Sequence, residues 1–475
     1  SLMNAISDLS WGGTLNAAWH LSGSPPVVVE SDEPYFENNA DIGGSKVIFT
    51  GLARGSNPTQ FTGLHGGMVL FNSNIGLVSS RGTPASTAPL RASQSTCPSC
   101  TFEATASLTA LGGLALFSDE QTATLWRSDG TAEGTRIVRS TPGTTNRNAL
   151  NWIAALNSTT GLLFTTEPKN VLLNESSYVT KLLRSKGPEQ STSLVKTFED
   201  SFSAQEPPAR HLGAVYFSAA DGKNGEELWR SDGTAAGTWM VKDIVSGADS
   251  SSPRHLTSAG RNLYFTFYDE NQSLFLGRAR AGTKEVTRIA PFPQRAPAPS
   301  AFTAVKESVY FRIGRDLYRS NGQPGDLQQV GRFDYSVKAQ YDSEKSDWPA
   351  AMTAFKDHLY FIARKGIDDP LQVWRVDCKA TQAEVVTPSF EVAAWEAQDV
   401  EFYVYADRLF LGIMDRVGVN GGIFEFKKTG KNFEWHRHTS MPAKSLRVSG
   451  GKLYFAGLDD QYGEEPRVMP LPQKT

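Results

Sequence analysis

The stretch Leu228-Trp-Arg-Ser-Asp-Gly-Thr-Ala-Ala-Gly-Thr-Trp-Met-Val241 decides the fold, because a nearly identical copy precedes it. That copy is Leu125-Trp-Arg-Ser-Asp-Gly-Thr-Ala-Glu-Gly-Thr-Arg-Ile-Val138. Upstream of each copy lies a short apolar run that ends in a phenylalanine, Phe217 or Phe117. Two copies of one element at this separation indicate a chain built from repeats.

The apolar run, often Leu-Tyr-Phe, recurs along the chain at steps of 44 to 53 residues. It ends at Phe71, Phe117, Phe164, Phe217, Phe265, Phe311, Phe361, Leu411 and Phe455. A period of this size is typical of solenoids, propellers and other arrays. The step persists where the Ser-Asp-Gly-Thr motif has decayed, so the repeat covers most of the chain.

Each unit predicts four short strands. From Ser107 to Val138, apolar and β-branched runs are bounded by Gly, Asp and Ser. Four antiparallel strands in roughly 40–50 residues match one propeller blade, and no segment shows a sustained helical period. The sequence therefore predicts an all-β fold, a single β-propeller of four-stranded blades. The count is about nine, and eight to ten blades fit the same pattern.

The last unit, from about Leu446 to Pro470, shows three strands and then stops. Propellers commonly close by taking a strand from the other terminus, which leaves no free sheet edge. The candidates are Val27-Val-Val29 and Lys46-Val-Ile-Phe-Thr50. We therefore predict an N-terminal segment, 1–56, that supplies the closing strand, and a propeller over 57–475, in one domain overall.

The Ser-Asp-Gly-Thr turn has a structural explanation. Gly130 and Gly233 can adopt the positive φ that a tight hairpin needs. The side chains of Asp129 and Asp232 can accept hydrogen bonds from nearby backbone N–H groups. We expect these four residues to hold the turn between the third and fourth strands.

From Glu227 to Thr234, with Gly237-Thr238 behind, the sequence resembles the bacterial ELWxxDGT repeat family. The match is near-complete from about Ala204 to Pro253, good in the unit before Val138, and skeletal elsewhere. In the last unit Pro466 and Arg467 stand where Leu and Trp would. The resemblance implies propeller blades in a secreted, cell-surface or periplasmic protein whose signal peptide has been removed. The turn also looks like the Asp-box of sialidases, which is structural there and transfers no catalysis.

The charge balance argues against two classes of partner. The chain has 47 basic and 50 acidic residues among 475, a net charge of −3. A nucleic-acid-binding protein should show a basic surplus or stripe. No apolar run is long enough to cross a bilayer. We expect neither a nucleic-acid partner nor a membrane span.

The cysteines are few. Cys97-Pro-Ser-Cys100 suits a local disulfide or two free thiols better than metal or redox chemistry, because no second pair or histidines at ligand spacing accompany it. Cys378 stands alone.

Two acidic loops offer oxygen ligands between second and third strands, in 221–227 and 459–465. Carboxylate and amide oxygens at such spacing can hold Ca²⁺. Neither loop matches the full EF-hand pattern, so a solvated hairpin loop is the more ordinary interpretation. If Ca²⁺ binds, the candidate ligands are Asp221, Asn224, Glu226, Asp459 and Glu464.

Arginines follow the apolar pair of the third strand in five units, at Arg127, Arg184, Arg230, Arg319 and Arg375. They could form a cationic ring around the channel and grip an anionic glycan. We favour a structural role that spans adjacent blades, because third strands lie away from a propeller's channel.

Histidines give one weak metal signal. His436-Arg-His438 puts two imidazoles on one face of a strand. Without a third ligand in reach, an exposed edge is the better interpretation.

No local catalytic motif can be named: the chain shows no Ser/His/Asp set, Walker loop or H-E-x-x-H. Our first hypothesis is a binding module, an adhesin or matrix component, that recognises a protein or glycan on one propeller face. The alternative is a carbohydrate-active enzyme, a glycosidase or lyase, with its site at the channel mouth. A glycosidase would need two carboxyl groups roughly 5–10 Å apart.

Overall fold

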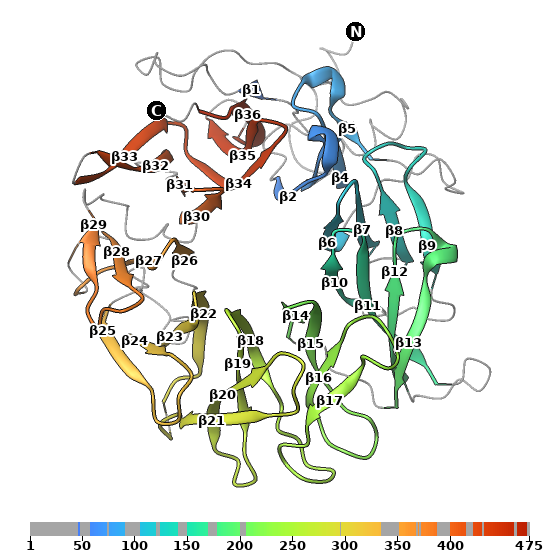
Figure 1. The fold of residues 1–475 in the computed structure, drawn as a ribbon. Helices are drawn as coiled ribbons and strands as arrows, with labels where there is room; N and C mark the ends of the chain where they lie inside the picture. The colour runs from blue at the N-terminus through green and yellow to red at the C-terminus, as the bar shows by residue number, and fades with distance from the viewer. Residues whose placement is uncertain are drawn as a thin grey trace, which may run out of the picture.

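The computed structural model describes residues 46–47, 58–73, 76–90, 105–119, 124–140, 150–169, 178–199, 206–294, 296–333, 351–366, 369, 372–386, 400–414, 421–429, 432–459 and 463–472. These residues form nine four-stranded antiparallel sheets, arranged as blades in a ring (Figure 1). The described ranges contain no α-helix and only three short 3-10 turns. The chain is a nine-bladed β-propeller, which confirms the predicted all-β fold and fixes the blade count.

The blades are numbered 1 to 9 from β2 onward. Within each blade the first three strands follow the chain order, starting with the innermost strand at the channel. The innermost strands are β2 (Thr59–Gly63), β6 (Thr105–Leu111), β10 (Leu150–Asn157), β14 (Ala209–His211), β18 (Arg254–Ala259), β22 (Pro299–Val305), β26 (Met352–Phe355), β30 (Val400–Tyr405) and β34 (Ala443–Ser449). The second strands are β3 (Val69–Ser73), β7 (Leu114–Asp119), β11 (Thr160–Pro168), β15 (Ala214–Ala219), β19 (Asn262–Tyr268), β23 (Ser308–Ile313), β27 (His358–Ala363), β31 (Arg408–Ile413) and β35 (Lys452–Asp459). The third strands are β4 (Gly76–Ser80), β8 (Thr124–Ser128), β12 (Tyr178–Ser185), β16 (Glu227–Ser231), β20 (Leu274–Arg280), β24 (Asp316–Ser320), β28 (Gln372–Asp377), β32 (Gly422–Thr429) and β36 (Gly463–Pro470). The outermost strands of blades 1 to 8 are β5 (Ala88–Pro89), β9 (Arg136–Ser140), β13 (Ser193–Phe198), β17 (Trp239–Lys242), β21 (Val286–Pro291), β25 (Gln328–Arg332), β29 (Glu384–Val386) and β33 (Asn432–Thr439).

Blade 9 is completed by the N-terminal strand. Its outermost strand is β1 (Lys46–Val47), which pairs antiparallel with β36 through Lys46 opposite Val468 and Val47 opposite Arg467. The second predicted closing candidate therefore supplies the strand, whereas 27–29 lies outside the described residues. Strands from near both ends of the sequence thus share one sheet, and its innermost strand, β34, contacts β2 of blade 1.

The antiparallel order gives the ring two different faces. First–second and third–fourth connections lie on one face, which we call the turn face. Second–third loops and the linkers between blades lie on the other, which we call the loop face. Each innermost strand contacts the innermost strand of both neighbouring blades, all the way around the channel (Figure 1).

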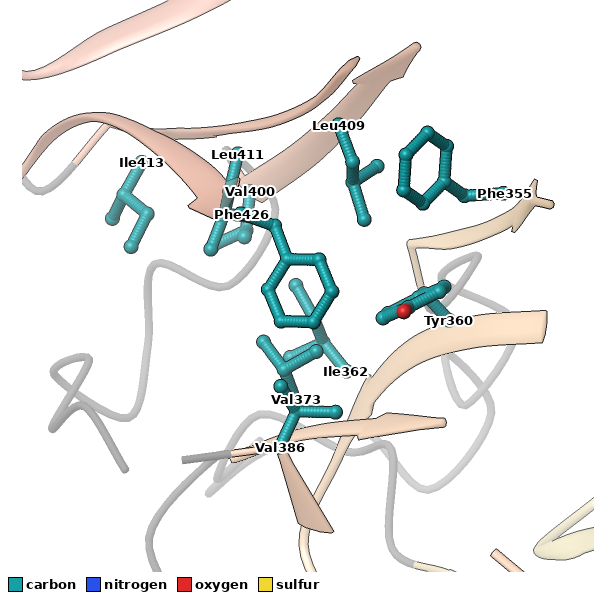
Figure 2. Close-up of a cluster of buried hydrophobic side chains, with 10 residues drawn as sticks. All are labelled: Phe355, Tyr360, Ile362, Val373, Val386, Val400, Leu409, Leu411, Ile413 and Phe426. Carbon is teal, nitrogen blue, oxygen red and sulfur yellow. The ribbon is translucent and has the colours of Figure 1, made fainter. Parts of the chain in front are cut away.

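The core is divided among the nine seams between blades, with one buried apolar cluster at each seam. Figure 2 shows the cluster between blades 7 and 8. There Tyr360 and Val373 of blade 7 face Leu409 and Phe426 of blade 8. Burial of apolar area stabilises each seam by roughly 25 cal/mol per Å². Each blade therefore depends on its neighbours, as the repeat predicted.

The tyrosine of the Leu-Tyr-Phe run links one blade to the next. Tyr264 donates from Oη to the carbonyl oxygen of Glu307 in blade 6, at 2.8 Å. Tyr216 accepts from the amide of Gly282 in blade 5, at 3.3 Å. At the seam between blades 9 and 1, the hydroxyl of Tyr454 is buried and has no hydrogen-bond partner among the residues that the structure describes. The closing seam therefore lacks this polar link.

Candidate functional site

The Ser-Asp-Gly-Thr turns are held by their own side chains. In blade 4, Asp232 Oδ1 accepts from the amide and the hydroxyl of Thr234, at 3.0 and 2.7 Å. Gly233 has φ +86° and donates its amide to Ser231 Oγ. Burial acts to raise the pKa of Asp232, but the hydrogen bonds from Thr234 outweigh it and lower that pKa.

Asp129 and Gly130 repeat this arrangement in blade 2, where Gly130 has φ +91°. The glycines also fit against the preceding blade. A Cβ on Gly130 would lie 2.6 Å from Met68 Cγ, and one on Gly233 would lie 3.1 Å from Leu156 Cδ2. The glycines of these turns therefore pack against the preceding blade, whereas the aspartate and threonine side chains form hydrogen bonds within the hairpin itself.

Glu227 anchors the linker that follows its blade. Its carboxylate is fully buried and accepts hydrogen bonds from the amides of Ile244, Val245 and Ser251. It also accepts from the Ser251 hydroxyl, at 2.6 Å. Burial raises the pKa of Glu227 despite these bonds. The first residue of the Glu-Leu-Trp motif thus has a structural role that sequence reasoning did not assign.

The blade 4 acidic loop brings together two of the predicted calcium ligands. Asp221 Oδ1 accepts from the Asn224 amide at 2.8 Å, and the Asn224 side chain also donates to the carboxylate. Glu226 instead pairs with Arg254 of blade 5, with Nη1 to Oε1 at 2.9 Å and Nη2 to Oε2 at 3.1 Å. All three predicted ligands of this loop thus have hydrogen-bond partners within the protein: Asp221 and Asn224 bond to each other, and Glu226 bonds to Arg254.

The blade 9 loop pairs its glutamate in a related way. Glu464 is buried and lies 3.2 Å from Lys444 Nζ, on the innermost strand of the same blade. The side chain of Asp459 lies outside the described residues. Among the residues that the structure describes, no group of three or more His, Cys, Asp or Glu could hold a metal. Glu226 and Glu464, the glutamates of the two acidic loops, thus each pair with a cation on an innermost strand, Arg254 and Lys444.

Cys97 and Cys100 lie outside the described residues, so the predicted disulfide stays a prediction. Cys378 is a half-buried free thiol.

The third-strand arginines lie away from the channel, since third strands are separated from it by two strands. Arg319 donates through Nη1 to the carbonyl oxygens of Cys378 and Ala380 in blade 7, both at 2.8 Å. The structural interpretation holds at this seam.

The histidine pair in β33 is divided. His436 is exposed on this outermost strand, as expected for an edge. His438 is instead buried, and its Nε2 lies 2.8 Å from Glu425 Oε2. Arg408 donates to both oxygens of the same carboxylate, at 2.7 Å each. Burial opposes ionisation, but Arg408 and His438 together lower the pKa of Glu425 to about 2. Only the fold could reveal this network, since its three residues come from three strands.

A mixed polar and aromatic cluster lies at the innermost strands of blades 5 and 6. We call it the mouth cluster; it comprises Glu206, Glu226, Arg254, His255 and Phe302. The half-buried rings of His255 and Phe302 stack with centroids 4.7 Å apart and an interplanar angle of 16°. The His255 amide donates to Glu206 Oε2 at 3.4 Å, and its Nδ1 lies 3.1 Å from Thr266 Oγ1.

Two β-bulges place these rings. The ladder between β18 and β19 shifts between Arg254 and Thr257, and that between β22 and β23 shifts between Ser300 and Thr303. His255 and Ala301 have φ of +56° and +55°, which is unusual for residues other than glycine. Bulges re-aim side chains and often accompany functional sites.

The electrostatics of the mouth cluster favour an uncharged imidazole. Burial lowers the pKa of His255, the Arg254 charge lowers it further, and Glu206 opposes them. The cluster therefore offers a neutral imidazole, a paired guanidinium and two carboxylates at the loop-face end of the channel wall. Such planar polar and aromatic groups can hold a polar ligand by stacking and hydrogen bonds.

The chain matches no known family's sequence profile, and no curated protein matches its sequence. The ELWxxDGT resemblance therefore stays a prediction. Several solved structures share some of the fold. A streptogramin B lyase is 13% identical over 77% of this chain and 93% of its own, with a TM-score of 0.32. A eukaryotic initiation factor is 9% identical over 85% and 93%, with a TM-score of 0.48.

A puromycin-hydrolyzing peptidase of Mycobacterium tuberculosis is 11% identical over 78% of this chain, with a TM-score of 0.38. The match spans 61% of the peptidase. These likenesses are too distant to carry an argument about activity. Within the described ranges, no helix is long and apolar enough to cross a bilayer.

Proposed function

We propose that the protein is a secreted or cell-surface binding module that recognises a protein or glycan on its loop face. The observation that carries this proposal is the asymmetry of the two faces. On the turn face, the first–second connection has two residues in blades 2 to 9, and the third–fourth connection of blades 1 to 8 has at most seven. On the loop face, most of the linkers between successive blades are longer, and 19 residues separate the end of β25 from the start of β26. Propellers place ligand loops on the face with long connections.

The mouth cluster supports the same face. Arg254 begins its innermost strand, Glu226 precedes the third strand of blade 4, and Glu206 lies in a linker. All three positions belong to the loop-face ends of their elements. The secreted location rests on the ELWxxDGT resemblance.

A binding screen tests this proposal. The purified chain is presented to immobilised glycans and to cell-surface protein fractions, with and without Ca²⁺. For each ligand found, Arg254→Gln should weaken binding by about tenfold to a hundredfold, because a charge-assisted contact contributes about 1.5–3 kcal/mol. Lys186→Ala, an exposed change in a third–fourth turn on the opposite face, is the matched control.

The outcomes separate the hypotheses. Ligands that respond to Arg254→Gln and not to Lys186→Ala support the loop face. Ligands that respond to neither variant, or a complete absence of ligands, would reject it. Loss of binding on chelation would point to the acidic loops, and turnover of a bound glycan would replace the module with an enzyme.

A further inference from the structure

A serine and a histidine meet on the channel wall between blades 4 and 5. They belong to β18 and β14, which are neighbouring innermost strands (Figure 1). His211 Nδ1 lies 2.8 Å from Ser258 Oγ. His211 is 1% exposed, whereas Ser258 is exposed. The pair therefore presents an accessible hydroxyl with a shielded imidazole behind it, and this is the arrangement that activates a serine nucleophile.

The propeller does not need a polar pair at this position. His211 is the last residue of its innermost strand, and its partner is the last but one of the next. The corresponding positions in the next two seams hold apolar residues, Ala259 with Ala304 and Val305 with Ala354, and each pair packs in the core cluster of its seam. An imidazole buried in place of such groups costs free energy unless it forms hydrogen bonds. A residue that departs from the pattern of its neighbours in this way indicates a functional role.

The surroundings of His211 suit a general base. Burial lowers the pKa of His211, so the ring is uncharged at neutral pH and can accept a proton. The Arg261 backbone and the charge of Glu307 act to raise that pKa, because both favour the protonated ring. The ring of Tyr216 meets the imidazole edge to face, with centroids 5.7 Å apart. An imidazolium that forms when Ser258 loses its proton is therefore stabilised where it arises.

The turn of blade 5 holds the Glu307 carboxylate near this pair. The Arg261 amide donates to Glu307 Oε2 at 3.0 Å. Gly260 leaves the space that the carboxylate occupies, since a Cβ there would lie 2.2 Å from Glu307 Cδ. Three successive blades thus contribute a base, a hydroxyl and a carboxylate to one stretch of the channel wall, from His211, Ser258 and Glu307.

The backbone of Ser258 supplies a hydrogen-bond donor on the channel side. Ala259 and Asn262 flank the two-residue turn and form the hydrogen-bonded pair that closes the hairpin. Ser258 belongs to the next pair of the ladder, in which the backbone groups do not bond across to the partner strand. Because β18 is innermost, the Ser258 amide points toward the channel. An amide beside the nucleophile can stabilise the oxyanion that forms when a hydroxyl attacks a carbonyl group.

From this arrangement we infer that Ser258 is a nucleophile with His211 as its general base, and that the pair transfers the acyl group of a carboxylic ester to water. Ser258 Oγ attacks the carbonyl carbon and its proton passes to His211 Nδ1. The ester C–O bond then breaks, and the imidazolium gives the proton to the leaving alcohol. Water attacks the acyl-serine by the same route, and cleavage of the acyl–Oγ bond restores the hydroxyl. This site lies at the turn-face end of β18 and the mouth cluster at its loop-face end, so the activity is separate from the proposed ligand binding.

Labelling of the full chain with a fluorophosphonate tests the inference, because this probe forms an Oγ–P bond with an activated serine and loses its fluoride as HF. We expect the wild type to carry the label in the tryptic fragment 255–261, whose single serine is Ser258. Ser258→Ala should abolish this label, and His211→Gln should slow it by about 100-fold or more. Ser193→Ala, which changes an exposed serine on the outermost strand β13, should leave the labelling rate unchanged.

A second arm leaves His211 in place and so does not depend on how its replacement folds. In Ser258→Cys the imidazole should activate the new thiol, and iodoacetamide at pH 7 should alkylate it about tenfold faster than the thiol of Ser193→Cys. A wild-type fragment 255–261 without label would overturn the inference. Equal alkylation of the two cysteine variants would overturn it as well, and so would an unchanged labelling rate in a His211→Gln variant that unfolds at the wild-type temperature.

Discussion

Replacement of Glu227 by alanine should be among the most damaging single changes in blade 4. The carboxylate accepts from three backbone amides, at 3.1 to 3.3 Å, and from the Ser251 hydroxyl. Each buried donor left without an acceptor costs about 1–3 kcal/mol. The cost of leaving four such donors unpaired exceeds the cost of burying a carboxylate, which the variant no longer has. We therefore expect a net loss of about 3–5 kcal/mol in the free energy of unfolding.

Denaturant unfolding measures this loss as a shift in midpoint at constant slope. Glu227→Gln keeps one side-chain oxygen as an acceptor and should fall between wild type and alanine. Glu133→Ala, an exposed glutamate in the blade 2 turn, should change stability by less than about 0.5 kcal/mol. Amide exchange of residues 244–251 should quicken in the alanine variant. A loss below about 1 kcal/mol would refute the reasoning, because it would mean that the linker amides find other acceptors.

Three further predictions concern the seams and one buried network. Gly130→Ala should lower the free energy of unfolding by about 2–4 kcal/mol, through backbone strain and through contact of the new methyl group with Met68. Gly213→Ala, at φ +83° with open space around it, should lose only the part due to strain. Equal losses of the two variants in thermal scans would contradict the packing argument. Tyr264→Phe should cost about 1 kcal/mol of unfolding free energy, because it removes the bond to Glu307. Tyr454→Phe should be neutral or stabilising, because it removes a buried hydroxyl that has no partner in the described part of the chain. Denaturant titrations of the two variants test this order, and a larger loss for Tyr454→Phe would count against the seam assignment. The pKa of Glu425, lowered to about 2, means that its ion pairs stabilise the fold above pH 4.5 and that this stability is lost as pH falls toward 2. The loss should amount to about 3 kcal/mol, measured by unfolding at a series of pH values, and Glu425→Gln should abolish this part of the pH dependence.

The period and local chemistry of the sequence determined the architecture. The nine apolar runs became the nine second strands, because a short continuous apolar run bounded by Gly and Asp is typical of a strand buried on both faces, as in β15 and β23. The turn glycines were also predictable, since only glycine adopts positive φ without a steric cost. The closing strand was predictable as one of two candidates, because the last unit lacked its fourth strand.

Only the tertiary structure decided which polar residues meet. Glu227 reaches amides up to 24 residues along the chain, and Arg254 reaches back to Glu226 of the preceding blade. His438 was predicted at an exposed edge and instead lies buried against Glu425 of the neighbouring strand. Such contacts depend on blade twist, on bulges at residues such as His255, and on which face of a strand meets the next blade. Those features arise from packing across the whole ring, so residue spacing alone specified the blades but not the partners of their charged groups.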